Sequence, residues 1–150
     1  MKTADLYASW GRVERLSGLG VQAEQHLLSA IDLDPGHGPA HETLGDTYFE
    51  RGSYAQAAQE YAIAAGLNPP RAAELWTHAG EALEEDGKRE RAGEMFERAL
   101  RALPGYAAAE AGLMRLRGPG NPSTPEPGNP SEKVRMFPTL PEKVTPSSGR

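Results

Sequence analysis

The chain contains no cysteine among its 150 residues, so disulfide bonds and thiolate catalysis are excluded and a reducing compartment suits it. No apolar run approaches the roughly 20 residues that a membrane-spanning helix needs. The first ten residues lack the basic-then-apolar pattern of a signal peptide. These absences predict no membrane insertion and leave the cytoplasm as the default location. The net charge of −5 also disfavours a nucleic-acid surface.

The patterns of common enzyme and metal sites are missing as well. No serine has the flanking glycines of a nucleophile elbow, and no phosphate-binding glycine loop follows a strand pattern. His37 and His41 have a spacing found in metal sites, but no third ligand lies near them in the sequence. We expect His26 and His78 to be isolated on helix surfaces. The sequence therefore predicts no catalytic activity, no metal and no cofactor.

Proline is scarce until residue 118 and abundant after it. Eight of the thirteen prolines follow Gly118, and residues 118–150 carry a net charge of +1, which leaves −6 on the first 117 residues. Because proline at this density opposes helix formation, we predict a disordered, Pro/Gly-rich tail over 118–150. Residues 133–144, KVRMFPTLPEKV, are more apolar than a simple linker. The candidate residues of a linear motif there are Arg135, Met136, Phe137, Pro138, Leu140 and Pro141.

An internal repeat organises the first 104 residues. Pro35, Pro69 and Pro104 are separated by 34 and 35 residues. Five further columns agree in the same register: Gly11, Gly45 and Gly80; Gly18, Gly52 and Gly87; Ala23, Ala57 and Ala92; Leu27, Tyr61 and Phe96; Ala30, Ala64 and Ala99. Periods of this length are typical of stacked repeat proteins.

Each column has a physical reason. Glycine within a helix costs about 1 kcal/mol relative to alanine, so the first glycine predicts a site where another helix approaches closely. The second glycine ends that helix, because glycine adopts positive φ without strain. The alanine and large apolar columns have helical spacing and predict the buried face of a second helix, which the proline closes. Each unit is therefore an antiparallel helix pair, and the pairs must stack to bury their faces.

This pattern resembles the tetratricopeptide repeat. The second unit supplies the motif residues Leu44, Gly45, Tyr48, Ala57, Tyr61, Ala64 and Pro69, and the third supplies Trp76, Gly80, Leu83, Ala92, Phe96, Ala99 and Pro104. The first unit departs from the pattern, since Glu14 replaces the expected aromatic residue. The resemblance implies an all-α, right-handed superhelix of antiparallel helix pairs over 3–117. Its repeats are about 3–36, 37–70 and 71–105, followed by a capping helix at 106–117.

The resemblance also implies a non-catalytic module that binds a protein segment in a concave groove lined by the first helix of each pair. The groove residues expected to contact a partner are Arg12, Glu42, Asp46, Phe49, Glu50, Glu74, His78, Glu81, Glu85 and Arg115. Family members that capture acidic chaperone C-termini use a clamp of lysine, asparagine and arginine. The matching positions here are Ala8, Arg12, Thr43, Glu74 and His78. An acidic groove with Phe49 inside it favours a basic and apolar partner.

Several alternatives stay open at this point. The acidic residues could be only a solvated helix face, and the chain could be an assembly or secretion chaperone that shields a client. It could also be the C-terminal part of a larger repeat protein whose tail recruits a partner. The segment 134–144 could dock on the repeats of its own copy or of a neighbour, which would give self-association through the tail, or it could stay free of them.

Overall fold

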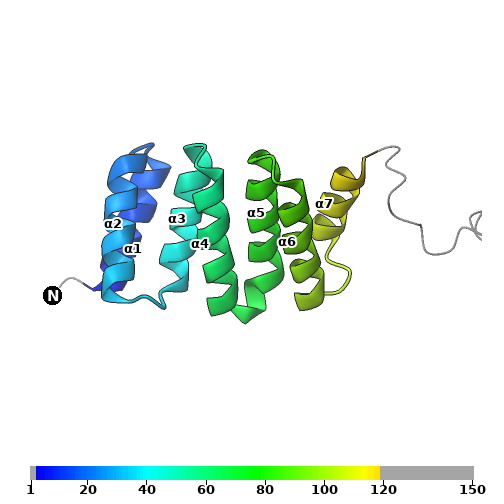
Figure 1. Cartoon of the computed structure of the whole chain (residues 1–150). Helices are drawn as coiled ribbons and strands as arrows, with labels where there is room; N and C mark the ends of the chain where they lie inside the picture. The colour runs from blue at the N-terminus through cyan, green and yellow to red at the C-terminus, as the bar shows by residue number, and fades with distance from the viewer. Residues whose placement is uncertain (1–2, 119–150) are drawn as a thin grey trace, which may run out of the picture. The chain divides into compact units, whose positions relative to one another are not determined.

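The structure, a computed structural model, describes residues 3–118 and consists there of helices without strands. The helices are α1 (Ala4–Leu16), α2 (Gly20–Leu33), α3 (Gly38–Glu50), α4 (Tyr54–Leu67), the 3₁₀ turn η1 (Pro69–Arg71), α5 (Ala72–Glu85), α6 (Arg89–Ala102) and α7 (Ala107–Arg117). Figure 1 shows them side by side in chain order. The residues expected to form the tail motif, 135–141, lie outside the described part of the chain.

Local chemistry fixes where the helices begin and end. Thr3 caps α1, since its side-chain oxygen accepts a hydrogen bond from the amide of Leu6 at 3.3 Å. Gly18, Gly52 and Gly87 separate the two helices of each pair with φ of 77°, 76° and 76°. This left-handed conformation favours glycine and lets the following amide reach back to the last turn of the first helix. The predicted helix-ending role of the second glycine column is thus confirmed.

The core runs through the stack as small residues that surround a few large ones. Ala23, Ala57 and Ala92 are fully buried in the second helices of the three pairs. Phe96 is also fully buried, and a Cβ built on Gly80 would lie 2.7 Å from its ring. Each helix packs against its neighbours in sequence, so the predicted all-α stack of adjacent helix pairs is confirmed. In the described range, no helix combines the length and the apolar character of a membrane span.

The first pair replaces an aromatic contact by a polar one. A carboxylate oxygen of Glu14 lies 2.7 Å from Nδ1 of His26, and the His26 ring packs against Tyr7 and Trp10 at centroid distances of 5.9 and 5.4 Å. His26 is therefore not an isolated surface residue, and that expectation was wrong. The two residues occupy the interface between α1 and α2 as a polar pair beside an aromatic cluster.

Candidate functional site

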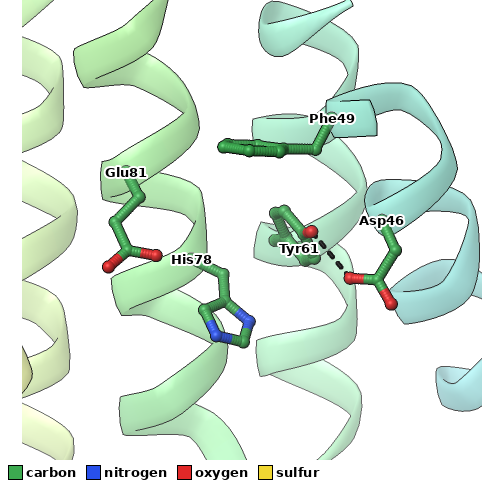
Figure 2. Close-up of a pocket in the computed structure, with 5 residues that line it drawn as sticks. All are labelled: Asp46, Phe49, Tyr61, His78 and Glu81. Carbon is green, nitrogen blue, oxygen red and sulfur yellow. Dashed lines mark hydrogen bonds between the residues drawn. The ribbon is translucent and has the colours of Figure 1, made fainter. Parts of the chain in front are cut away.

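A hollow of about 210 Å³ opens between α3, α4 and α5. Asp46 and Phe49 line it from α3, His78 and Glu81 line it from α5, and Tyr61 of α4 lies between them (Figure 2). Residues three apart share one face of a helix, so α3 and α5 each present one acidic side chain and one aromatic ring to the hollow. Four of these five residues are groove residues that the sequence predicted.

Tyr61 forms the floor of this hollow. The residue is 4% exposed, and a Cβ built on Gly45 would lie 2.9 Å from its ring. Its hydroxyl donates a hydrogen bond of 2.7 Å to Oδ1 of Asp46, which Figure 2 marks. Burial and the Asp46 carboxylate together raise the pKa of the Tyr61 hydroxyl, so it stays protonated and donates to Asp46. Repeat register identified Tyr61 only as a buried residue, and its polar contact was not foreseen.

Asp46 carries a charge in partly dehydrated surroundings. Burial raises the pKa of this carboxyl, while the Tyr61 hydrogen bond and the guanidinium of Arg15 oppose the shift. The Arg15 Nη2 atom lies 3.6 Å from Oδ2 of Asp46. Because the net shift is upward, the charged form is held at a cost in desolvation that a bound cation would offset.

His78 differs from the expectation that it is isolated on a helix surface. Its ring lies 5.3 Å from the Tyr61 ring, between centroids, so it is not an isolated surface residue. Its Nδ1 atom is buried and has no hydrogen-bond partner among the described protein atoms. Phe49 packs edge-on against Tyr54 at a centroid distance of 5.2 Å and is only partly exposed. The hollow thus has aromatic walls with carboxylates on two sides.

The remaining predicted groove residues are spread over other contacts. Arg71 binds Glu42 at 2.7 and 2.8 Å and Glu74 at 2.9 and 3.0 Å, and so joins α3 to α5. Glu50 pairs with Arg15. The guanidinium of Arg115 binds Glu84 at 3.0 and 3.4 Å. Arg12 and Glu85 are exposed and do not line the hollow.

Two arginines near these acids were missed from the sequence. Arg15 shares its repeat position with Phe49. Applying the repeat register to the first helix would therefore have identified Arg15 as a groove residue. Arg71 belongs to the turn before α5, which a count along helix faces does not reach. The acidic surface is therefore partly neutralised by its own arginines, and Asp46 and Glu81 remain as the acids that line the hollow.

The other histidines have structural contacts in the described chain. His37 caps α3, with its Nδ1 accepting from the Ala40 amide at 3.0 Å and its Nε2 lying 2.8 Å from Asp5. His41 is buried, and its ring nitrogens contact Glu60 at 2.6 Å and the Pro35 carbonyl at 2.9 Å. Within residues 3–118, histidines and acids form no group of three that is placed to hold a metal ion.

Comparison with known proteins agrees with this architecture. Residues 73–104 match the family model of the tetratricopeptide repeat. The N-terminal domain of stress-induced protein-1 (STI-1) from C. elegans has 20% identity and a TM-score of 0.69, over 76% of this chain and 94% of that one. The first tetratricopeptide repeat domain of Spaghetti (RPAP3), bound to the HSP90 peptide SRMEEVD, has 22% identity and a TM-score of 0.66, over 76% of this chain and 90% of that one.

The MamA protein is a further match, with 25% identity and a TM-score of 0.63 over 67% of this chain and 54% of that one. A comparison with curated protein sequences gives no match. At these identities the solved structures show the fold alone, and the predicted fold class is confirmed by them.

Proposed function

Because the chain is a helical repeat protein with the tetratricopeptide fold, we propose that it is a non-catalytic interaction module that binds a protein segment. The segment is basic and partly apolar, and it places one lysine or arginine side chain in the hollow between Asp46 and Glu81. The observation that carries this proposal is the partly buried Asp46 carboxylate on the Tyr61 floor. Residues 3–117 are the proposed binding unit, acting as an adaptor or scaffold.

The size and chemistry of the hollow support a single cationic side chain. Sites for small molecules usually enclose about 300–1,000 Å³, whereas this hollow has about 210 Å³. Asp46 and Glu81 supply opposite charge for a cation, and the faces of Phe49 and Tyr61 attract one through their ring electrons. Apolar residues beside the cation would then contact the exposed part of Phe49.

Solved structures of the same fold support peptide binding, but the peptides bound to them differ in charge from the one proposed here. The RPAP3 domains were solved with the HSP90 peptide SRMEEVD and with the HSP70 peptide SGPTIEEVD, both of which end in acidic residues. In this chain Glu74 and His78 stand at two of the positions that the family resemblance assigns to the carboxylate clamp. Glu74 is bound by Arg71, and the carboxylates of Asp46 and Glu81 that line the hollow would repel an acidic peptide.

Peptide pools test the proposal directly. Arrayed 12-residue peptides with a fixed central lysine, arginine, glutamine or glutamate, flanked by apolar residues, are measured by fluorescence anisotropy against the full chain. We expect binding to the lysine and arginine pools that weakens with salt. Asp46→Asn and Glu81→Gln should each weaken it about tenfold, while Glu94→Gln on α6 should not, because Glu94 is an exposed acid that does not line the hollow.

Stability measurements separate a lost site from a lost fold. Since burial raises the pKa of Asp46, its charged form costs stability at neutral pH, and that cost disappears at acidic pH where the carboxyl is protonated. Asparagine keeps an acceptor for Tyr61, so Asp46→Asn should unfold at the same or a higher temperature than the natural chain at pH 7. Equal binding of the glutamate pool, or binding unchanged in both variants, would contradict the proposal.

A further inference from the structure

Exposed apolar side chains are concentrated on the first helix pair. Twelve large hydrophobic residues are exposed in the described chain, and eight of them lie between residues 6 and 33: Leu6, Trp10, Val13, Leu16, Leu19, Val21, Leu28 and Leu33. Scattered exposed apolar residues are normal, but a concentration on one element indicates an interaction surface.

Repeat register shows what kind of surface this is. Three residues of α1, Leu6, Trp10 and Val13, are 37%, 38% and 60% exposed; we call them the α1 outer stripe. The same repeat positions are Ala40, Leu44 and Thr47 in α3, and Leu75, Ala79 and Ala82 in α5, all at most 1% exposed. The helices α3 and α5 each pack on the second helix of the preceding pair, α2 and α4. The α1 outer stripe therefore has the position of a helix–helix contact, yet Leu6 and Val13 at its two ends are exposed.

We propose that the α1 outer stripe is covered by the same stripe of a second copy, in a two-fold, antiparallel contact between the two α1 helices. The stripe is symmetric about the point between Ser9 and Trp10, with Leu6 and Val13 equally far on either side. Reversing the helix therefore places Leu6 of one copy opposite Val13 of the other. At the centre, each Trp10 meets the small Ser9 of the partner.

Charge complementarity favours this antiparallel arrangement. Asp5 and Arg12 flank the stripe on one side and are also seven residues apart, that is, two helical turns. Both are exposed, and the Asp5 side chain is 89% exposed even with one oxygen 2.8 Å from His37. An antiparallel two-fold contact keeps the flank of Asp5 and Arg12 on the same side in both copies and brings Asp5 of each copy beside Arg12 of the other, whereas a parallel two-fold contact would put these flanks on opposite sides and separate them.

Head-to-tail stacking is disfavoured by the other end of the array. The last helix, α7, exposes Glu110, Arg115 and Arg117. An apolar stripe packed there would dehydrate these charges, because the stripe itself carries no charged residue. Closed two-fold contacts are also the commonest arrangement of identical chains.

The contact has a consequence for the candidate site. Arg12 shares its repeat position with Asp46 and Glu81, which line the hollow. A two-fold axis across α1 keeps this side of both copies facing the same way, so the two hollows would open toward one side of the dimer. The contact of one helix with one helix is smaller than the roughly 800 Å² per partner of a standard interface, so we expect a dissociation constant in the micromolar range.

Sedimentation velocity on the full chain, from about 1 µM to about 1 mM, tests the contact. We expect a monomer–dimer equilibrium that Val13→Glu shifts at least tenfold toward monomer. Met114→Glu is the matched control, because Met114 is 73% exposed on α7 and lies outside the stripe. Circular dichroism should show the same helicity in both variants, since both side chains face solvent.

Charge exchange tests the direction of the helices. Asp5→Arg and Arg12→Asp should each weaken the dimer, and the double variant should recover at least half of the lost affinity. A chain that stays monomeric throughout, a species larger than a dimer, or equal effects of Val13→Glu and Met114→Glu would overturn the proposal. Failure of the double variant to recover affinity would overturn the antiparallel contact. Val13→Glu does not change the hollow or any predicted groove residue, so its effect on the dimer is independent of the peptide measurements.

Discussion

Gly80 shows how strongly one residue controls the distance between two helices. A Cβ built on it would lie 2.7 Å from the Phe96 ring, and a Cβ on Gly112 would lie 2.6 Å from the same ring. Phe96 of α6 is thus held between glycines of α5 and α7 and is fully buried. Glycine at position 80 leaves room for this ring, which occupies the space that any other side chain would need.

We therefore predict that Gly80→Ala lowers the unfolding free energy by about 1–3 kcal/mol, because the rigid ring has no free space to move into. The matched control is Gly66→Ala in α4, where nothing lies within 4 Å of the added Cβ. There alanine should stabilise the chain by about 0.4–1 kcal/mol, since it restricts the unfolded state. Urea unfolding followed by circular dichroism measures both changes. If Gly80→Ala leaves the unfolding free energy unchanged, the interpretation of this glycine column as a site of close helix contact is wrong.

Between elements, Arg71 is the polar link in a stack held together mainly by apolar contacts. It binds Glu42 of α3 and Glu74 of α5 from the turn that precedes α5. Its hydrogen bonds lower the pKa of the Glu74 carboxyl, so the carboxylate is favoured in the folded state. All three side chains are partly solvated, and the link therefore adjusts stability more than it determines it.

This link predicts a pH-dependent difference. A depressed pKa contributes stability above the unfolded value of about 4.5 and loses it as the pH falls through the lower folded value. Arg71→Met should therefore be less stable than the natural chain at pH 7 by less than about 1 kcal/mol, and the difference should shrink as the pH falls below about 4. Arg91→Met, at an exposed position of α6, should show a smaller change with pH. Thermal unfolding measured from pH 7 to below about pH 4 gives this difference in stability. A difference that does not change with pH would rule out the ion pairs as its cause.

The sequence predicted elements better than contacts between them. Gly45 and Gly18 could be interpreted from sequence because each answers a local steric demand that recurs every repeat. Asp46 and Glu81 could be placed on the groove side by helical spacing alone. The hydrogen bond from Tyr61 to Asp46 and the reach of Arg15 from α1 to α3 depend on how far helices stand apart, which no single-helix pattern contains.

Across the described molecule, the two ends of the stack differ in how they meet solvent. The α7 helix covers Phe96 with Gly112 and exposes one large apolar residue, Met114, among the charged residues Glu110, Arg115 and Arg117. At the other end, α1 leaves Leu6 and Val13 exposed. In a linear stack each helix pair is stabilised by its neighbours, so a pair with one neighbour opens more readily than a pair with two.

Amide hydrogen exchange should report this gradient and its dependence on concentration. In dilute chain, at about 1 µM, the amides of α3, α4 and α5 should exchange slowest and those of α1 faster, because α3 to α5 are covered on both sides. Raising the chain to about 500 µM should slow exchange in α1 and leave α7 unchanged, since only α1 gains a partner in the proposed dimer. Val13→Glu should abolish that response while retaining the gradient. Uniform slowing along the whole chain, or slowing confined to α7, would contradict a contact through the α1 outer stripe, because protection would then arise elsewhere in the stack.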